Sequence, residues 1–185
     1  DGVYSPFLSK TTHDGKDICV LSAALSKDKY KKRIKKYFNK VVPSSESLAS
    51  LNTSYTKEGA YIYIPEGICP EDPVQIMHFS TGNQNSIWLQ PRNLIIADKG
   101  SKIEIIERHQ SLKDHSVVTN SLTEIYAERN AFVDYYKIQN DLKTSSLIDN
   151  TFISQERDSN VSVHTFSFGG KLTRNNLNFY HNCNR

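Results

Sequence analysis

The chain has 185 residues, 37% hydrophobic and 23% charged, with ten Tyr, eight Phe, eight Gly and six Pro. These proportions fit one globular domain with an apolar core and exclude a disordered or collagen-like chain. The formal net charge of +3 is too small to indicate a nucleic-acid or membrane partner, and no run of about 18 apolar residues predicts a transmembrane helix.

Residues 1–57 are predicted to form a loop followed by helices. Residues 1–26 carry turn signals at Ser5-Pro6 and Asp14-Gly15 and contain no regular period. Pro43 is expected to end a first helix, and Ser44 or Ser45 to cap a second short helix that runs through Leu48 and Leu51. The first helix is predicted from one apolar stripe formed by Tyr30, Ile34, Tyr37 and Phe38.

The opposite side of this first helix is basic. A nucleic-acid or anionic-membrane patch is one interpretation, and a solvated helix face is the other. The second is favoured because an apolar stripe lies behind the charges and the whole chain is nearly neutral, although an acidic partner could also face them. The basic residues are Lys27, Lys29, Lys31, Lys32, Arg33, Lys35 and Lys36.

From residue 58 onward the helical period disappears and short segments rich in Ile, Val, Tyr, Phe and Thr alternate with polar or glycine breaks. Strands without intervening helices exclude a βαβ unit and leave a sandwich, a barrel or a solenoid. The predicted strands are 60–64, 74–79, 93–97, 102–108, 121–127, 132–139, 149–154, 161–168 and 172–180.

An internal repeat favours the solenoid over a β-sandwich of similar hairpins. Residues 97–109 align with 127–139 and then with 155–167, at offsets of 30 and 28 residues. Core and corner positions stay in step, as one coil of a β-solenoid requires. The core sets are Ile103, Val133, Val161 and Ile105, Tyr135, Val163, and the corner set is Gly100, Asn130, Asp158. Because no cap follows strand 172–180, we expect a β-helix core at 58–185 that is incomplete at its C-terminus.

Short strings in a fixed order resemble the SufB/SufD family of iron–sulfur cluster assembly scaffolds, and SufD more than SufB. The resemblance spans about residues 50–178. Its strings are Leu51-Asn-Thr-Ser-Tyr, Gly59-Ala-Tyr-Ile-Tyr-Ile-Pro-Glu-Gly67, Pro91-Arg-Asn-Leu-Ile, Ile106-Glu-Arg-His-Gln-Ser111, Thr119-Asn-Ser-Leu-Thr-Glu124, Arg157-Asp-Ser159, His164-Thr-Phe-Ser-Phe-Gly-Gly170 and Arg174-Asn-Asn-Leu-Asn178.

The resemblance implies a right-handed parallel β-helix flanked by helical domains in a cytoplasmic scaffold protein that is not an enzyme. It implies a SufB-type paralogue and a SufC-type ATPase as partners of the full-length protein. In the family, the ATPase-docking helices and the cluster site lie toward the carboxyl end, so we expect a fragment truncated at both ends that binds no cofactor. The iron–sulfur cluster would be handled by the full complex, and the fragment could form a homodimer through its open coil.

Metal ligands are sparse in the sequence. His109, His115, His164, His181 and Cys183 show no H-x-x-x-H or C-x-x-C spacing, so most are expected to be structural. Cys183 is the most notable, because a thiolate is the natural iron–sulfur ligand. The three cysteines, which include Cys19 and Cys69, are dispersed and odd in number, which is typical of a reduced, cytoplasmic protein.

The alternative function is that of a carbohydrate-active β-helix enzyme, which would need a pair of carboxylates on one face. Glu104, Glu107, Glu124 and Asp134 lie on predicted strands, and Glu104 and Asp134 share a register position on the outward face. This position repeats from coil to coil and gives no evidence of catalysis, so no catalytic residue is predicted. Amide stacking at corners or inside the solenoid is expected for Asn93, Asn120, Asn175, Asn176 and Asn178.

Overall fold

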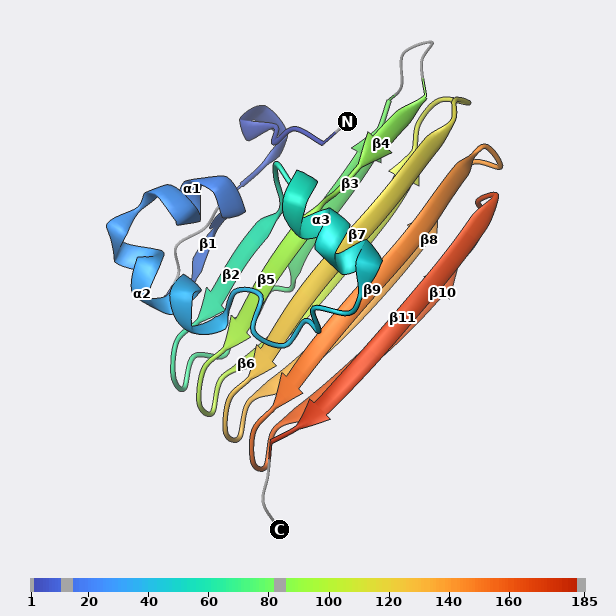
Figure 1. Cartoon of the computed structure of the whole chain (residues 1–185). Coiled ribbons are helices and arrows are strands. Elements are labelled where there is room, and N and C mark those ends of the chain that lie inside the picture. Colours follow the sequence, from blue (N-terminus) through green and yellow to red (C-terminus); the bar gives the residue numbers. More distant parts are fainter. Residues whose placement is uncertain (1, 11–14, 82–85, 183–185) are drawn as a thin grey trace.

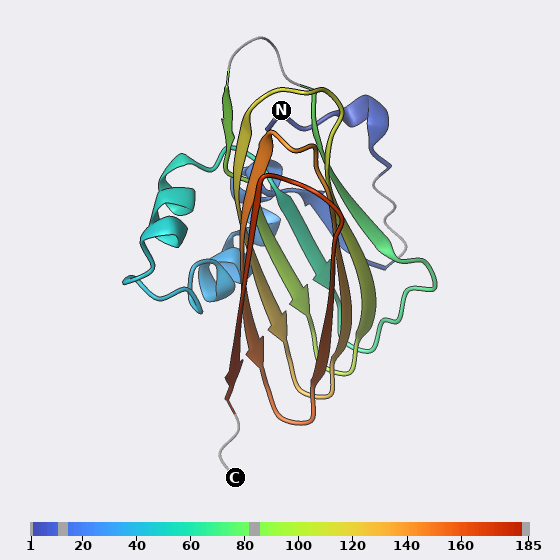
Figure 2. The same ribbon diagram turned by 90° about the vertical axis from the view of Figure 1, so that its right-hand side faces the viewer.

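The computed structural model describes residues 2–10, 15–81 and 86–182, and these form a parallel β-helix of about four coils. Each coil adds one strand to each of two sheets, which face each other in Figure 2. One sheet, here sheet A, contains β1 (Asp17–Val20), β2 (Ala60–Ile64), β5 (Arg92–Ala97), β7 (Val117–Ala127), β9 (Ser145–Gln155) and β11 (Leu172–His181), with β4 (Ile87–Leu89) paired to β7. Sheet B contains β3 (Val74–Ser80), β6 (Lys102–Ser111), β8 (Phe132–Asn140) and β10 (Asn160–Ser167).

The predicted repeat is confirmed residue by residue. Ile103 pairs with Val133 and Val133 with Val161, in parallel register. The corner residues Gly100, Asn130 and Asp158 all have positive φ, at 64°, 58° and 59°. A positive φ lets the chain turn sharply from sheet A to sheet B, and Gly, Asn and Asp are the residues that adopt it at least cost. The coil length therefore follows from where such residues recur.

The expectation of an irregular segment at residues 1–26 is wrong in part. Residues 6–8 form a 3₁₀ turn, η1 (Pro6–Leu8), and β1 pairs antiparallel with β2, so that Ile18 lies opposite Ile62. Helix α1 (Leu21–Ser26) follows directly. The sequence signal for β1 is weak because the strand has only four residues and gains its hydrogen bonds from β2. Asp14 of the predicted turn lies outside the described residues.

The helices end and begin at positions other than those predicted. Helix α2 (Asp28–Tyr37) ends before Asn39, whose φ of 59° breaks the helix four residues earlier than Pro43. Helix α3 (Ser47–Tyr55) has Glu46 at its N-cap and no side-chain cap, so neither Ser44 nor Ser45 caps it. The apolar stripe of α2 is confirmed, since Tyr30, Ile34 and Tyr37 are buried. All three helices pack on the outer side of sheet A (Figure 1). No helix among the described residues is long and apolar enough to cross a membrane.

The interior of the solenoid divides into an apolar half and a polar half. Near the turns that lead from sheet A to sheet B, inward Ile, Val and Ala side chains form the main core. Further along each strand of sheet B, the inward positions turn polar. The apolar members are Ile62, Ile64, Val74, Ile76, Ile95, Ala97, Ile103, Ile105, Ile125, Ala127, Ala131, Val133, Tyr135 and Ile153.

Candidate functional site

The polar half of the interior begins where the strands of sheet B continue past their apolar residues. Side chains of a strand alternate between its two faces, so Ile103 and Ile105 on the inner face of β6 are followed by Glu107 and His109 on that face. On the neighbouring strand β3, His78 is the register partner of His109. Strand pairing therefore stacks His78 and His109 beside Glu107.

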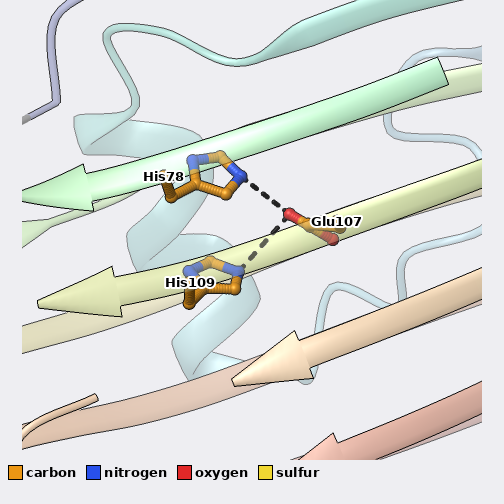
Figure 3. Close-up of side chains that lie close together, drawn as sticks. All are labelled: His78, Glu107 and His109. Atoms are coloured by element: carbon orange, nitrogen blue, oxygen red, sulfur yellow. Dashed lines mark hydrogen bonds and ion pairs between the residues drawn. The ribbon is translucent and has the colours of Figure 1, made fainter. Parts of the chain in front are cut away.

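These three residues form a compact cluster (Figure 3). His78 Nε2 lies 2.8 Å from Glu107 Oε1, and His109 Nε2 lies 3.4 Å from the same oxygen. The two imidazole rings stack with centroids 4.4 Å apart and an angle of 14° between their planes. Glu107 is fully buried and His109 retains 5% of its surface. The cluster is thus a charged group inside the protein, where an unpaired charge would be costly.

The carboxylate of Glu107 is held on its other sides by neutral donors. Asn93 on β5 donates from Nδ2 to Oε1 at 2.8 Å, and the hydroxyl of Tyr135 on β8 donates to Oε2. Asn93 also donates to Thr123 Oγ1 at 3.1 Å. Hydrogen bonds from both sheets therefore hold the Glu107 carboxylate in one position.

The protonation states within the cluster are set by burial and mutual charge. Burial opposes ionisation of Glu107, but its contacts with His109 and His78 outweigh burial and hold the pKa of Glu107 well below its ordinary value. Burial, and next the charge of His109, lower the pKa of His78. For His109, burial lowers the pKa, but Glu107, Asp149 and Asp141 together raise it. Near neutral pH the favoured state is an ionised Glu107 beside a neutral His78.

A second ion pair continues the polar interior toward the last coils. Lys137 on β8 pairs with Asp149 on β9, and both are buried. The Lys137 ammonium also donates to Thr151 Oγ1 at 2.7 Å and to Asn175 Oδ1 at 3.4 Å. A small pocket beside this pair is lined by His109, Lys137, Gln139, Asp149, Thr165 and Asn175, among others. Polar residues thus line the interior from the first coil to the last.

Two family models match the chain. The model described as "SUF system FeS cluster assembly, SufBD core domain" matches residues 78–184, which is more than half of the chain. The chain belongs to the SufBD family. The model described as "SufBD protein N-terminal region" matches residues 1–76, so the boundary between the two models falls within β3.

Curated relatives carry the same family name. An iron-sulfur cluster assembly SufBD family protein of Synechocystis is 24% identical over 96% of this chain and 41% of its own length. The chloroplastic protein ABCI7 of Arabidopsis thaliana is 30% identical over 72% of this chain and 30% of its own length. A SufBD family protein of Staphylococcus aureus is 31% identical over 80% of this chain and 31% of its own length. This SufBD chain spans less than half the length of these relatives.

Of the metal ligands considered from the sequence of this SufBD chain, His109 is the one that the described residues place in a cluster. His164 stacks on Tyr136 with ring centroids 4.8 Å apart, and His115 bonds the carbonyl of Lys113. His181 is exposed at the end of β11, and Cys183 lies outside the described residues. The sequence reasoning missed His78, because the 31 residues between it and its register partner His109 match neither of the offsets, 30 and 28, in the visible repeat.

The carboxylates fall into two groups. Glu104 and Asp134 are register partners on the outer face of sheet B, with Glu104 exposed, as predicted. Glu107 and Glu124 are fully buried, which the sequence reasoning did not predict. Glu124 lies on the outer face of sheet A, under the helices, where it pairs with Arg92. The Glu124–Arg92 pair is buried, so Glu124 cannot flank an open groove as the carboxylates of a glycosidase do.

The predicted amide stacking is confirmed for part of the Asn set. Asn176 Nδ2 donates to Asn150 Oδ1 at 2.7 Å, and Asn150 donates to Asn120 Oδ1 at 3.4 Å, which joins three successive coils. Asn93 instead donates a hydrogen bond to Glu107, and Asn175 donates to Thr165 Oγ1 at 3.0 Å across the interior. These amides are structural, since each links neighbouring strands or the two sheets.

Proposed function

We propose that this chain is part of a non-catalytic scaffold subunit of a SufBCD-type complex that assembles iron–sulfur clusters. The observation that carries the proposal is the match to both parts of the SufBD family, residues 1–76 and 78–184, on a parallel β-helix. In this proposal the full-length protein pairs with a SufB-type paralogue and binds a SufC-type ATPase, and the cluster is cargo of the complex. It would work in a reducing compartment such as the cytoplasm, where dispersed thiols stay reduced.

The geometry supports a scaffold more than an enzyme. A β-helix gives long, straight sheet faces whose residues repeat at fixed spacing, a surface suited to docking other proteins. The buried carboxylates Glu107, Glu124 and Asp149 are each paired with a basic side chain rather than exposed in a cleft.

A pull-down from native extract tests the proposal. The full-length protein is tagged and recovered under reducing conditions, and co-purifying proteins are identified by mass spectrometry. The expected result is a SufC-type ATPase and a SufB-type paralogue in fixed ratio to the bait. Recovery of the intact, folded bait without either protein would refute the proposal. Turnover of an acidic polysaccharide by that bait would favour the carbohydrate-active alternative instead.

A further inference from the structure

We propose that His78, Glu107 and His109 bind one divalent first-row transition-metal ion, Fe(II) or Zn(II), inside the β-helix. The inference goes beyond the scaffold function and does not depend on it, because it rests on side-chain geometry alone. Two imidazoles and one carboxylate are the donor set that both ions accept in proteins, with further coordination positions left open. Calcium and magnesium prefer sites built from oxygen ligands, so the imidazoles favour a transition metal.

The separations between the donor atoms fit a shared ion. All three ligand atoms lie within 4.8 Å of one another, and the two His–Glu separations are 2.8 and 3.4 Å. Metal–ligand bonds of about 2.0–2.2 Å place cis or tetrahedral donors roughly 3 to 3.5 Å apart. Both measured His–Glu separations lie close to that range. The two imidazoles stack nearly parallel, so their side chains must rotate until both Nε2 atoms point at one ion beside the carboxylate.

A buried atom of the cluster lacks a hydrogen bond, which independently points to a ligand. Among the described residues His109 Nε2 has no hydrogen-bond partner, although it is buried and aimed at the Glu107 carboxylate. Its 3.4 Å contact with Glu107 Oε1 is a charge contact that lacks hydrogen-bond alignment. An unsatisfied buried nitrogen is destabilising, so few such atoms persist in native proteins without a reason. Coordination to a metal would satisfy this nitrogen.

The surroundings of the cluster suit a cation. Asn93 and Tyr135 orient the carboxylate in the way that outer hydrogen bonds orient metal ligands.

The side of the first coil is the more accessible side of the cluster. Strand β3 is the edge strand of sheet B, and the His78 side chain keeps 21% of its surface exposed while Glu107 has none. An ion arriving from solvent would meet His78 first and then reach the two buried ligands. Water could fill the remaining positions on that side.

The test uses the 185-residue chain, titrated with Zn(II) in competition with a chromophoric chelator and with Fe(II) under anaerobic conditions. We expect one ion per chain. His109→Gln and Glu107→Gln should each weaken binding by at least about 100-fold, since both remove a direct ligand. His164→Gln is the matched control, because His164 lies on the outer face of sheet B and should leave affinity unchanged.

Ring-nitrogen NMR of the wild-type chain decides the matter even if a cluster variant fails to fold. One equivalent of Zn(II) should shift the Nε2 resonances of His78 and His109 and leave those of His164 unchanged. The proposal is overturned if wild type binds no ion, or if these two resonances do not move. It is also overturned if folded His109→Gln binds as tightly as wild type, or if His164→Gln loses the ion. Failure of the pull-down described above would leave this result unaffected, so the two proposals fail separately.

Discussion

Arg92 Nη2 and Glu124 Oε1 lie 2.5 Å apart, and neither side chain has any exposed surface. The two residues come from adjacent strands, β5 and β7, on the outer face of sheet A. Arg92 also donates to Asn39 Oδ1 at 3.1 Å, just after α2, and to Thr53 Oγ1 at 2.9 Å, in α3. This buried ion pair therefore joins the N-terminal helices to the β-helix.

Removing one partner of this pair should strongly destabilise the protein. Glu124→Gln leaves the Arg92 charge buried without a counter-ion, and breaking such a pair costs about 3–5 kcal/mol. We expect a loss of that size in the free energy of unfolding, measured by urea denaturation. The exposed pair Lys99–Glu66, at 3.2 Å, is the control, and Glu66→Gln should cost no more than about 1 kcal/mol. Equal losses in the two variants would contradict this account.

Gly59 is required because the backbone of the next coil approaches it. A Cβ at this position would lie 1.6 Å from the carbonyl oxygen of Arg92, so Gly59→Ala must displace either β2 or β5. We expect destabilisation of about 3 kcal/mol or more, the upper end of overpacking costs, seen as a large fall in Tm.

Gly67 provides the comparison. It has a positive φ of 71°, but a methyl group at this position would meet nothing within 4 Å, so Gly67→Ala introduces backbone strain only. Its expected cost is about 1–2 kcal/mol. A Gly59→Ala variant as stable as Gly67→Ala would show that the coils can separate at this point without penalty.

The stability of the chain should depend on pH through the histidine cluster. His109 has a raised pKa in the folded state, so its contribution is complete below its ordinary value of 6.5 and is lost as pH rises through the folded pKa. Glu107 and His78 have lowered pKa values, so their contributions are present above their ordinary values of 4.5 and 6.5 and are lost as pH falls. Chelator-treated protein is unfolded with urea between about pH 5 and 9.

The variant His109→Asn should remove the loss of stability on the alkaline side. His164→Gln, an exposed histidine on the outer face, should keep the wild-type profile. If the stability of both variants follows the wild-type pH profile above pH 6.5, then the pKa of His109 is not raised by folding.

Asn130 occupies a coil corner that demands positive φ. A β-branched residue is poorly tolerated there, so Asn130→Val should cost about 1–2 kcal/mol, whereas Asn130→Gly should stay within about 0.5 kcal/mol of wild type. Thermal unfolding followed by circular dichroism measures both. A Val variant as stable as the Gly variant would mean that the corner does not require a left-handed residue.

Much of the fold could be predicted from local sequence. The inward residues Ile103, Val133 and Val161 and the corners Gly100, Asn130 and Asp158 recur in step, and strand alternation and left-handed turns are properties of single residues and their neighbours. All nine predicted strands exist, most of them longer than predicted. The short strands β1 and β4 were missed because their hydrogen bonds come from distant partners, β2 and β7.

The candidate site was predicted much less well. His109 was considered as a ligand, but His78 was not, and Glu107 was grouped with ordinary strand carboxylates. The proximity of the two histidines depends on the pairing of β3 with β6, in the first coil, where no repeat is visible in the sequence. Burial of the other two residues likewise depends on tertiary packing. Glu107 is buried because sheet A faces it across the interior, and Glu124 is buried because the N-terminal helices cover the outer face of sheet A.

The coil length, the parallel direction of the strands and the corner residues can be read from the sequence, because they rest on the repeat, on the two-residue period of strands and on φ preferences. Which polar residues share the interior depends on how the coils stack in the folded chain. Stacking adjacent coils about 4.8 Å apart brings side chains from different coils into contact and removes water from around them. The same stacking of coils that the repeat predicts therefore also gathers His78, Glu107 and His109 into one buried cluster.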